Sequence, residues 1–221
     1  MNCLHTFDAV LFDVDGTLID SAPGILYTMR EAFTRMGTDV SQVDLTQYMG
    51  PPLRKTFSEY YTCEADIERA VTYYRTSYKE KGAHMCSLFP GVKEMLTQLR
   101  AAGIPLYTAT SKPTVVVVPM LEELGIADFF TEIGGASMGP ERDTKTAVIE
   151  YILDSHNLRD KRVLMVGDRK DDLAGAANCG LPAAGVLYGY GSKEELSPYD
   201  PVFLAKDCHE LTTYILKGEA L

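Results

Sequence analysis

Residues 12–21 read FDVDGTLIDS, and this stretch decides how the rest of the chain is interpreted. It follows a mostly apolar segment, residues 7–12, which predicts a buried strand. Asp13 and Asp15 stand two residues apart where this strand ends, and Gly16 permits a sharp turn of the backbone. Neighbouring carboxylates in a fold repel each other unless a cation or a shared proton compensates. We therefore expect a divalent cation bound by oxygen ligands at this strand end, with Mg²⁺ as the predicted ion.

Composition limits the classes of protein to which the chain can belong. Its 221 residues suffice for one α/β core with a small insertion. The net charge of −10, without a dense run of Lys or Arg, argues against a nucleic-acid partner. Five scattered cysteines without a CxxC spacing favour free thiols in a reducing cytoplasm over disulfides or zinc. We see no signal peptide and no apolar run that would span a membrane, so we expect a cytoplasmic protein with no membrane partner.

The order of sequence patterns predicts the architecture. After the first strand comes a block of helical spacing, in which Pro23 opens a helix that stops near Gly37. Strands and helices then alternate, which predicts an α/β fold with a Rossmann-like parallel sheet and helices on both faces. We expect this core to comprise residues 1–17 and 84–221, with a small α-helical domain inserted at 18–83. The later strands are predicted at 104–108, 129–133, 162–166 and 183–186, and the helices at 92–103, 114–124, 144–154, 173–179 and 211–216.

In such sheets the site lies beyond the carboxyl ends of the strands, so the residues that follow each strand are the candidates. Thr110 and Ser111 follow the second strand, and hydroxyl groups at the start of a helix suit phosphate oxygens. Lys145 opens a later helix, where the helix dipole disfavours a cation, and this slightly favours a functional role. We interpret Lys112 as structural.

A second acidic turn follows the apolar strand at 162–166. Asp168 and Asp172 would bring carboxylate oxygens to the same edge of the sheet as the first acidic pair. Asp171 is interpreted as an acid that favours the start of a helix. The predicted metal ligands are Asp13, Asp15, Asp168 and Asp172.

These motifs resemble those of the haloacid dehalogenase superfamily, in the branch that is similar to phosphoglycolate phosphatases. The D-x-D-G-T-L motif stands at residues 13–18 and the G-D-x-x-x-D motif at 167–172, while Thr110 and Lys145 match the two single-residue motifs. The resemblance extends over essentially the whole chain. The helical block resembles the cap domain of that family, and the GPPL sequence at 50–53 resembles the cap turn that faces the active site in related phosphatases.

The resemblance implies a Mg²⁺-dependent phosphatase that hydrolyses a small phosphorylated metabolite through an aspartyl-phosphate intermediate. Asp13 would be the nucleophile and Asp15 the acid and base, with the main-chain carbonyl of Asp15 among the metal ligands. Thr110 and Lys145, with Ser111 beside them, would bind the phosphoryl oxygens. Phosphoglycolate, a nucleotide and a sugar phosphate all remain open as substrates, as do a monomer and a homodimer.

Two other functions share these motifs. A sugar phosphomutase similar to β-phosphoglucomutase would pass the phosphoryl group to a sugar instead of water, and the GPPL turn favours the hydrolase over it. A non-catalytic binding module on the same fold is disfavoured, because it would not need both acids of the first motif. A dehalogenase needs neither a metal nor an acid at position 15, so we do not expect one.

Overall fold

The structure is a computed structural model that describes residues 6–50 and 53–218. The chain divides into two compact units, one formed by the residues up to Asp20 with those from Leu88 onward, and the other by Ser21–Ser87. We call them the core unit and the helical unit. The assignment of residues 18–83 to a separate domain stays a prediction.

The core unit is built on a parallel sheet. Within the described residues it has six strands in the order β5-β4-β1-β6-β7-β8. The central strand β1 pairs with β4 on one side and β6 on the other, so that Val10 lies opposite both Leu106 and Leu164. Because the strands are parallel, their carboxyl ends share one edge. The strands are β1 (Ala9–Phe12), β4 (Leu106–Pro113), β5 (Glu132–Ala136), β6 (Val163–Gly167), β7 (Ala183–Val186) and β8 (Phe203–Ala205).

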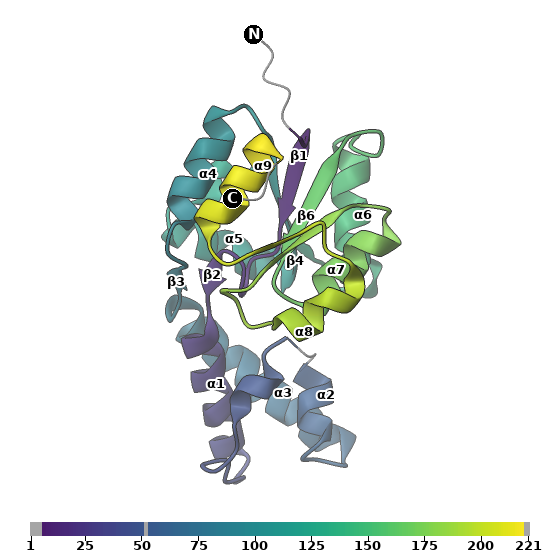
Figure 1. The fold of residues 1–221 in the computed structure, drawn as a ribbon. Helices are drawn as coiled ribbons and strands as arrows, with labels where there is room; N and C mark the ends of the chain where they lie inside the picture. Colours follow the sequence, from purple (N-terminus) through teal and green to yellow (C-terminus); the bar gives the residue numbers. More distant parts are fainter. Residues whose placement is uncertain (1–5, 51–52, 219–221) are drawn as a thin grey trace. The chain divides into compact units, whose positions relative to one another are not determined.

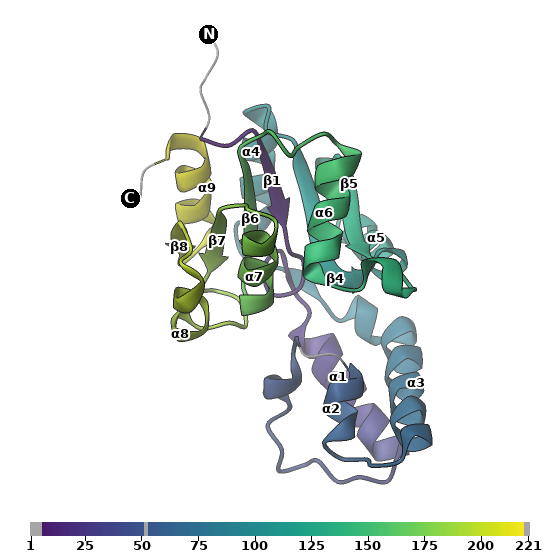
Figure 2. The same cartoon turned by 90° about the vertical axis from the view of Figure 1, so that its right-hand side faces the viewer.

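Helices cover both faces of this sheet (Figures 1 and 2). Apolar side chains of α6 and α7, among them Ile149 and Leu173, pack on Ala9 and Leu11 of β1. On the other side α4 and α9 pack against each other. The predicted parallel α/β class is confirmed. The helices of this unit are α4 (Val92–Ala101), α5 (Thr114–Glu123), α6 (Lys145–Ser155), α7 (Lys170–Asn178), α8 (Lys193–Leu196) and α9 (Cys208–Lys217).

Short elements complete the described residues. A separate two-stranded sheet is formed by β2 (Ile19–Asp20) and β3 (Ser87–Leu88). The 3₁₀ turns are η1 (Leu45–Tyr48), η2 (Gly82–His84), η3 (Ala127–Phe129), η4 (Pro140–Arg142) and η5 (Ser197–Tyr199).

Some elements differ from the sequence-based expectation. The strand predicted at 104–108 runs on to Pro113, so Thr110 and Ser111 lie within β4 and not at the start of a helix. The strand predicted at 129–133 begins at Glu132, because residues 127–129 form a 3₁₀ turn. The predictions contained neither β8 nor α8, each of which is shorter than five residues.

The helical unit contains α1 (Ala22–Arg35), α2 (Leu53–Ser58) and α3 (Glu64–Glu80). The ring of Phe33 is fully buried, with its centroid 5.3 Å from that of Phe57 and 4.6 Å from that of Tyr60. The aromatic residues of this unit therefore form its core. Of the GPPL turn, Pro51 and Pro52 lie outside the described residues. In the part of the chain that the structure describes, no helix has the length and apolar character needed to cross a membrane.

Candidate active site

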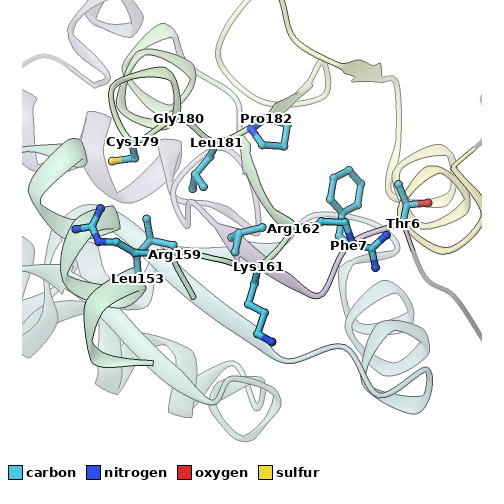
Figure 3. Close-up of a pocket in the computed structure, with 11 residues that line it drawn as sticks. Thr6, Phe7, Leu153, Arg159, Lys161, Arg162, Cys179, Gly180, Leu181 and Pro182 are labelled. Carbon is cyan, nitrogen blue, oxygen red and sulfur yellow. The ribbon is translucent and has the colours of Figure 1, made fainter. Parts of the chain in front are cut away.

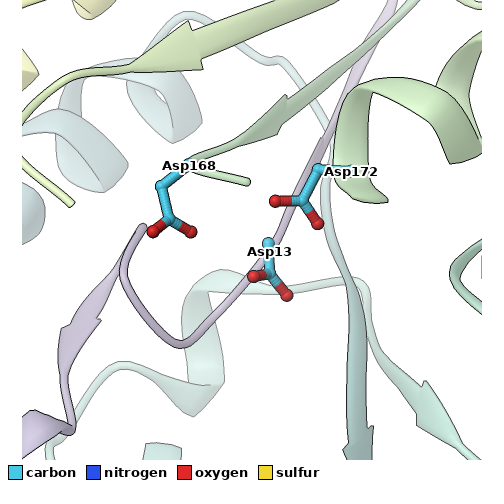
Figure 4. Close-up of side chains that lie close together, drawn as sticks. All are labelled: Asp13, Asp168 and Asp172. Carbon is cyan, nitrogen blue, oxygen red and sulfur yellow. The ribbon is translucent and has the colours of Figure 1, made fainter. Parts of the chain in front are cut away.

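Three carboxylates converge at the carboxyl edge of the central strands. Asp13 directly follows β1, Asp168 directly follows β6, and Asp172 lies in the first turn of α7. All three residues are buried, and one carboxylate oxygen from each lies within 4.8 Å of the others. Figure 4 shows the three carboxyl groups gathered in one place. The structure thus brings together three of the acids predicted as metal ligands, although they are spread over 160 positions of sequence.

The two turns that carry these acids are held by specific contacts. The main-chain N–H of Asp13 donates to the carbonyl of Val166 at 2.8 Å, which joins the end of β1 to β6. Gly16 has a φ of 82°, a conformation that favours glycine, and a side chain there would collide with the Asp168 carboxylate. Gly16 of the D-x-D-G-T-L motif therefore leaves room for Asp168 of the G-D-x-x-x-D motif.

Lys145, the first residue of α6, lies among the acids. Its Nζ donates to Oδ1 of Asp13 at 2.6 Å and to the carbonyl of Ala109 at 2.8 Å, and it lies 2.7 Å from Oδ1 of Asp172. Thr144 caps the helix with its hydroxyl and so fixes the position where the helix begins. The ammonium group offsets part of the repulsion between the two carboxylates.

Hydrogen bonds orient the other two carboxylates. Asp168 accepts at Oδ1 from the hydroxyl of Thr17 at 3.3 Å and at Oδ2 from the N–H of Tyr190 at 2.8 Å. Asp172 accepts at Oδ2 from the N–H of Arg169 at 3.0 Å. Buried polar groups that are fixed in this way are preorganised for a ligand.

Burial and neighbouring charges shift the pKa values of the cluster. Burial raises the pKa of Asp13 to about 6, and the charge of Asp172 adds to this effect. Burial, and then the charges of Asp172 and Asp13, raise the pKa of Asp168 to about 8. Burial alone would lower the pKa of Lys145, but the charges of Asp13 and Asp172 raise it. When all three carboxylates are ionised, they and the one ammonium carry a net charge of −2, which a dication would neutralise.

The donor set fits such an ion. Oxygen ligands on opposite sides of Mg²⁺ are about 4 Å apart, because each Mg–O bond is about 2.0–2.1 Å long. The oxygens of the cluster, within 4.8 Å of one another, are close to this spacing. A hard cation prefers carboxylate oxygens, and no nitrogen or sulfur ligand belongs to the cluster among the described residues.

Asp15 has a different environment. Its carboxylate is not in the cluster and accepts at Oδ1 from Nζ of Lys112 at 2.8 Å. Thr110 is buried, its hydroxyl accepts from the N–H of Lys112 at 3.2 Å, and Ser111 is exposed. Sequence reasoning interpreted Lys112 as structural and so missed this ion pair. The position of Lys112, two residues after Thr110, indicated only that Lys112 lies near the site, and not which residue its side chain contacts.

A cavity of about 300 Å³ lies elsewhere in the core unit (Figure 3). It is lined by Phe7 and Val163, next to the amino ends of β1 and β6, and therefore lies at the edge of the sheet opposite to the acids. Of its cations, Arg159 pairs with Asp154 and Arg162 with Asp8. None of the predicted site residues lines it.

A sequence profile described as haloacid dehalogenase-like hydrolase matches residues 10–186, which include the acid cluster and Lys145. The chain belongs to this family. The predicted resemblance is therefore confirmed, and so is the prediction of a hydrolase.

The named relatives include two hydrolases, a nucleotidase and a phosphatase, and one kinase. A 5'-nucleotidase of Pseudomonas aeruginosa is 36% identical over 200 residues, covering 90% of each chain. A phosphoglycolate phosphatase of Vibrio parahaemolyticus is 30% identical, covering 91% of this chain and 93% of its own. The tyrosine-protein kinase PtkA of Mycobacterium tuberculosis is 39% identical over 82% of this hydrolase, which spans only 62% of the kinase.

Solved structures agree with the family assignment. A haloacid dehalogenase-like hydrolase of Streptococcus pneumoniae superposes with a TM-score of 0.89 at 33% identity, covering 94% of this chain and 98% of that one. A protein described as a predicted phosphatase of Clostridium acetobutylicum superposes with a TM-score of 0.86 at 38% identity, covering 96% and 99%. The fold of this hydrolase is therefore that of the family over nearly its whole length.

Proposed function

We propose that this hydrolase is a Mg²⁺-dependent phosphatase that cleaves a small phosphomonoester through an aspartyl-phosphate on Asp13. One observation carries the proposal: a buried carboxylate at the end of β1 is paired with Lys145 and shares a possible cation site with Asp168. A buried acid with an adjacent cation and a metal site is a suitable nucleophile toward phosphorus, because both neighbouring charges attract the dianionic phosphoryl group.

Asp13 and Lys145 would act together. Lys145 binds Oδ1 of Asp13, which leaves Oδ2 to attack phosphorus in line with the leaving oxygen. The bond between phosphorus and the leaving oxygen breaks as the new bond to Asp13 forms. Because this ammonium lies 2.6 Å from Asp13, it would also contact a phosphoryl oxygen on Asp13 and stabilise its charge.

Asp13 and Asp168 would hold Mg²⁺, together with the main-chain carbonyl of Asp15. A bound Mg²⁺ would neutralise charge on the phosphoryl oxygens and help to orient phosphorus toward Asp13. Asp172 lies beside these ligands, and Lys145 and the main-chain N–H of Arg169 each contact one of its oxygens. Asp172 would orient Lys145 and would contact the metal either directly or through water.

The remaining predicted residues would handle protons and phosphate oxygens. Asp15 would protonate the leaving oxygen and later remove a proton from the water that hydrolyses the intermediate. Thr110, buried within β4, would donate its hydroxyl to a phosphoryl oxygen. Ser111 is exposed beside it and would contact a more peripheral oxygen of the substrate.

The names of the relatives support a small soluble ester as substrate. A phosphoglycolate phosphatase and a 5'-nucleotidase both act on a terminal phosphate of a small metabolite, and we place this hydrolase among such enzymes. The free thiols of Cys63, Cys86, Cys179 and Cys208 support a reducing cytoplasmic location.

The test is phosphate release from a panel of phosphomonoesters with Mg²⁺ or with a chelator. Asp13→Asn should abolish release and also abolish the mass increase of one phosphoryl group seen after rapid quenching. Asp171→Asn is the matched control, because Asp171 is an exposed acid one residue from Asp172. Release of phosphate by Asp13→Asn at the wild-type rate would refute the nucleophile assignment.

Transfer to an acceptor other than water is the second candidate, and the PtkA relative favours it. The phosphorylated Asp13 would then pass its phosphoryl group to a hydroxyl of a tyrosine or a sugar. Product analysis separates the two candidates: inorganic phosphate indicates the phosphatase, whereas a phosphorylated peptide or an isomerised sugar phosphate indicates transfer.

A further inference from the structure

Lys112 lies against the residue assigned to proton transfer. Its Nζ donates to Oδ1 of Asp15 at 2.8 Å across 97 positions of sequence. The side chains of Lys112 and Asp15 are only 11% and 22% exposed. The ion pair therefore connects the end of β4 to the turn after β1 within the core unit, and it is better shielded than an ion pair on the surface.

A bulge in β4 determines where Lys112 lies relative to the neighbouring strand β5. Thr110 pairs with Gly135 and Pro113 pairs with Ala136, so the bulged strand advances three residues while β5 advances one. Bulges of this kind redirect side chains, and they are frequent next to active sites. Gly135 gives the bulge its space, because a Cβ there would lie 2.5 Å from the carbonyl oxygen of Lys112.

Lys112 also contacts the candidate phosphate ligand. Its main-chain N–H donates to the hydroxyl oxygen of Thr110 at 3.2 Å, while its Nζ lies 3.6 Å from the sulfur of Met120 in α5. One residue therefore holds Thr110 by its main chain and Asp15 by its side chain. This geometry fixes the position of the proton donor relative to the strand end that carries Thr110.

We propose that Lys112 is a positioning residue that holds Asp15 by Oδ1 and leaves Oδ2 for proton transfer. The inference rests on the proposed phosphatase function. In the first step an oxygen of Asp13 bonds to phosphorus, the bond to the leaving oxygen breaks, and the proton on Oδ2 of Asp15 moves to that oxygen. In the second step water bonds to phosphorus, the bond to Asp13 breaks, and Oδ2 of Asp15 takes the proton of the water.

This role makes the effect of a substitution depend on the leaving group. An alkoxide needs the proton as it departs, whereas the para-nitrophenolate ion departs without one. In Lys112→Met we expect kcat/KM for an alkyl phosphate to fall about 10²-fold, since a positioned acid contributes about 10²–10⁴-fold. For para-nitrophenyl phosphate the fall should stay below about 10-fold, because kcat/KM ends at the first irreversible step and excludes the attack of water.

The experiment compares the two esters in the wild type, Lys112→Met, Lys112→Arg and Lys206→Met at saturating Mg²⁺. Lys206 is an exposed lysine paired with Glu210, so it receives the same substitution away from the site. The expected result is a selective loss on the alkyl ester in Lys112→Met, substantial recovery in Lys112→Arg and no change in Lys206→Met. Thermal unfolding of each variant separates a loss of function from a loss of fold.

Two results would overturn the positioning role: an equal loss on both esters, which indicates general damage or substrate binding, and no loss on either. If Lys112→Met does not fold, Lys112→Gln gives the same comparison with a polar side chain that carries no charge. A wild-type protein inert toward every ester would contradict the proposed function itself, and the role of Lys112 would fall with it.

Discussion

The ammonium nitrogen of Lys145 lies 2.6 Å from Oδ1 of Asp13, and both residues are buried. A pair of this kind has two consequences. It fixes the acid that would attack phosphorus, and it makes the core unit depend on the charge of one lysine. Removing one partner of a buried pair leaves the other charge without compensation.

Replacing Lys145 by Met should therefore affect both stability and activity. We expect the free energy of unfolding to fall by about 3 kcal/mol, because Asp13 and Asp172 lose their shared cation. Phosphate release should fall by at least about 10²-fold, the usual effect of removing one group that stabilises the transition-state charge. Urea unfolding and steady-state kinetics measure the two effects. Lys170→Met, at an exposed lysine of α7, should change neither, and wild-type activity in Lys145→Met would exclude its role.

The raised pKa values of the acids predict how stability without metal depends on pH. Asp13 and Asp168 have pKa values of about 6 and about 8 in the fold, against 3.8 for the ordinary side chain. Between about pH 3.8 and pH 8 the folded protein binds more protons at these two acids than the unfolded chain does. The free energy of unfolding therefore falls as the pH rises. The slope is at most about 1.4 kcal/mol per pH unit for each proton.

Bound Mg²⁺ should prevent this loss of stability at higher pH, because the ion takes the place of the protons on the carboxylates. Thermal unfolding from pH 4 to pH 8, with a chelator or with Mg²⁺, measures the effect as a melting-temperature difference that grows with pH. Two outcomes would contradict the assignment of the cluster as a metal site. One is a melting temperature that rises with pH in the presence of the chelator, and the other is a melting temperature at pH 8 that is the same with and without Mg²⁺.

Gly16→Ala tests the packing of the D-x-D-G-T-L motif against the G-D-x-x-x-D motif. The left-handed backbone conformation costs about 1–2 kcal/mol for any residue with a side chain, and the added methyl would also collide with Asp168. Gly103→Ala is the matched control, because Gly103 has a φ of 81° and no atom within 4 Å of the added Cβ. We expect similar backbone strain in both variants but weaker Mg²⁺ binding only in Gly16→Ala, as measured by calorimetry. Equal Mg²⁺ affinity in the two variants would show that the space beside Gly16 is unimportant.

Phe33→Ala tests the aromatic core of the helical unit. Phe33 is fully buried against Phe57 and Tyr60, and truncation of such a ring costs about 3–5 kcal/mol. Limited proteolysis should then cut first within residues 21–87. Phe33→Leu keeps most of the volume and should cost less than about 1.5 kcal/mol. Resistance to proteolysis in Phe33→Ala equal to that of the wild type would place the stabilising core of this unit elsewhere.

The acids of the site were predictable because strand ends are readable from sequence. Asp13 and Asp168 each follow an apolar run, and parallel strands bring their carboxyl ends to one edge. The extent of β4 was not predictable in the same way, because its last residues pair with β5 across a bulge that depends on Gly135. The Lys112–Asp15 ion pair depends on that bulge. The hydrophobic periodicity of β1 or of β4 therefore does not predict that the two side chains meet.

The hydrogen bond from Asp13 to Val166 joins the two strands at the centre of the sheet, whereas β5 and β8 lie at its edges. Local opening of a sheet begins at its edge strands and costs less free energy than separation of its central strands. Amide protons of β1 and β6 should accordingly exchange with solvent last. The candidate catalytic centre should then remain intact in partly opened forms of the enzyme and be lost only on global unfolding.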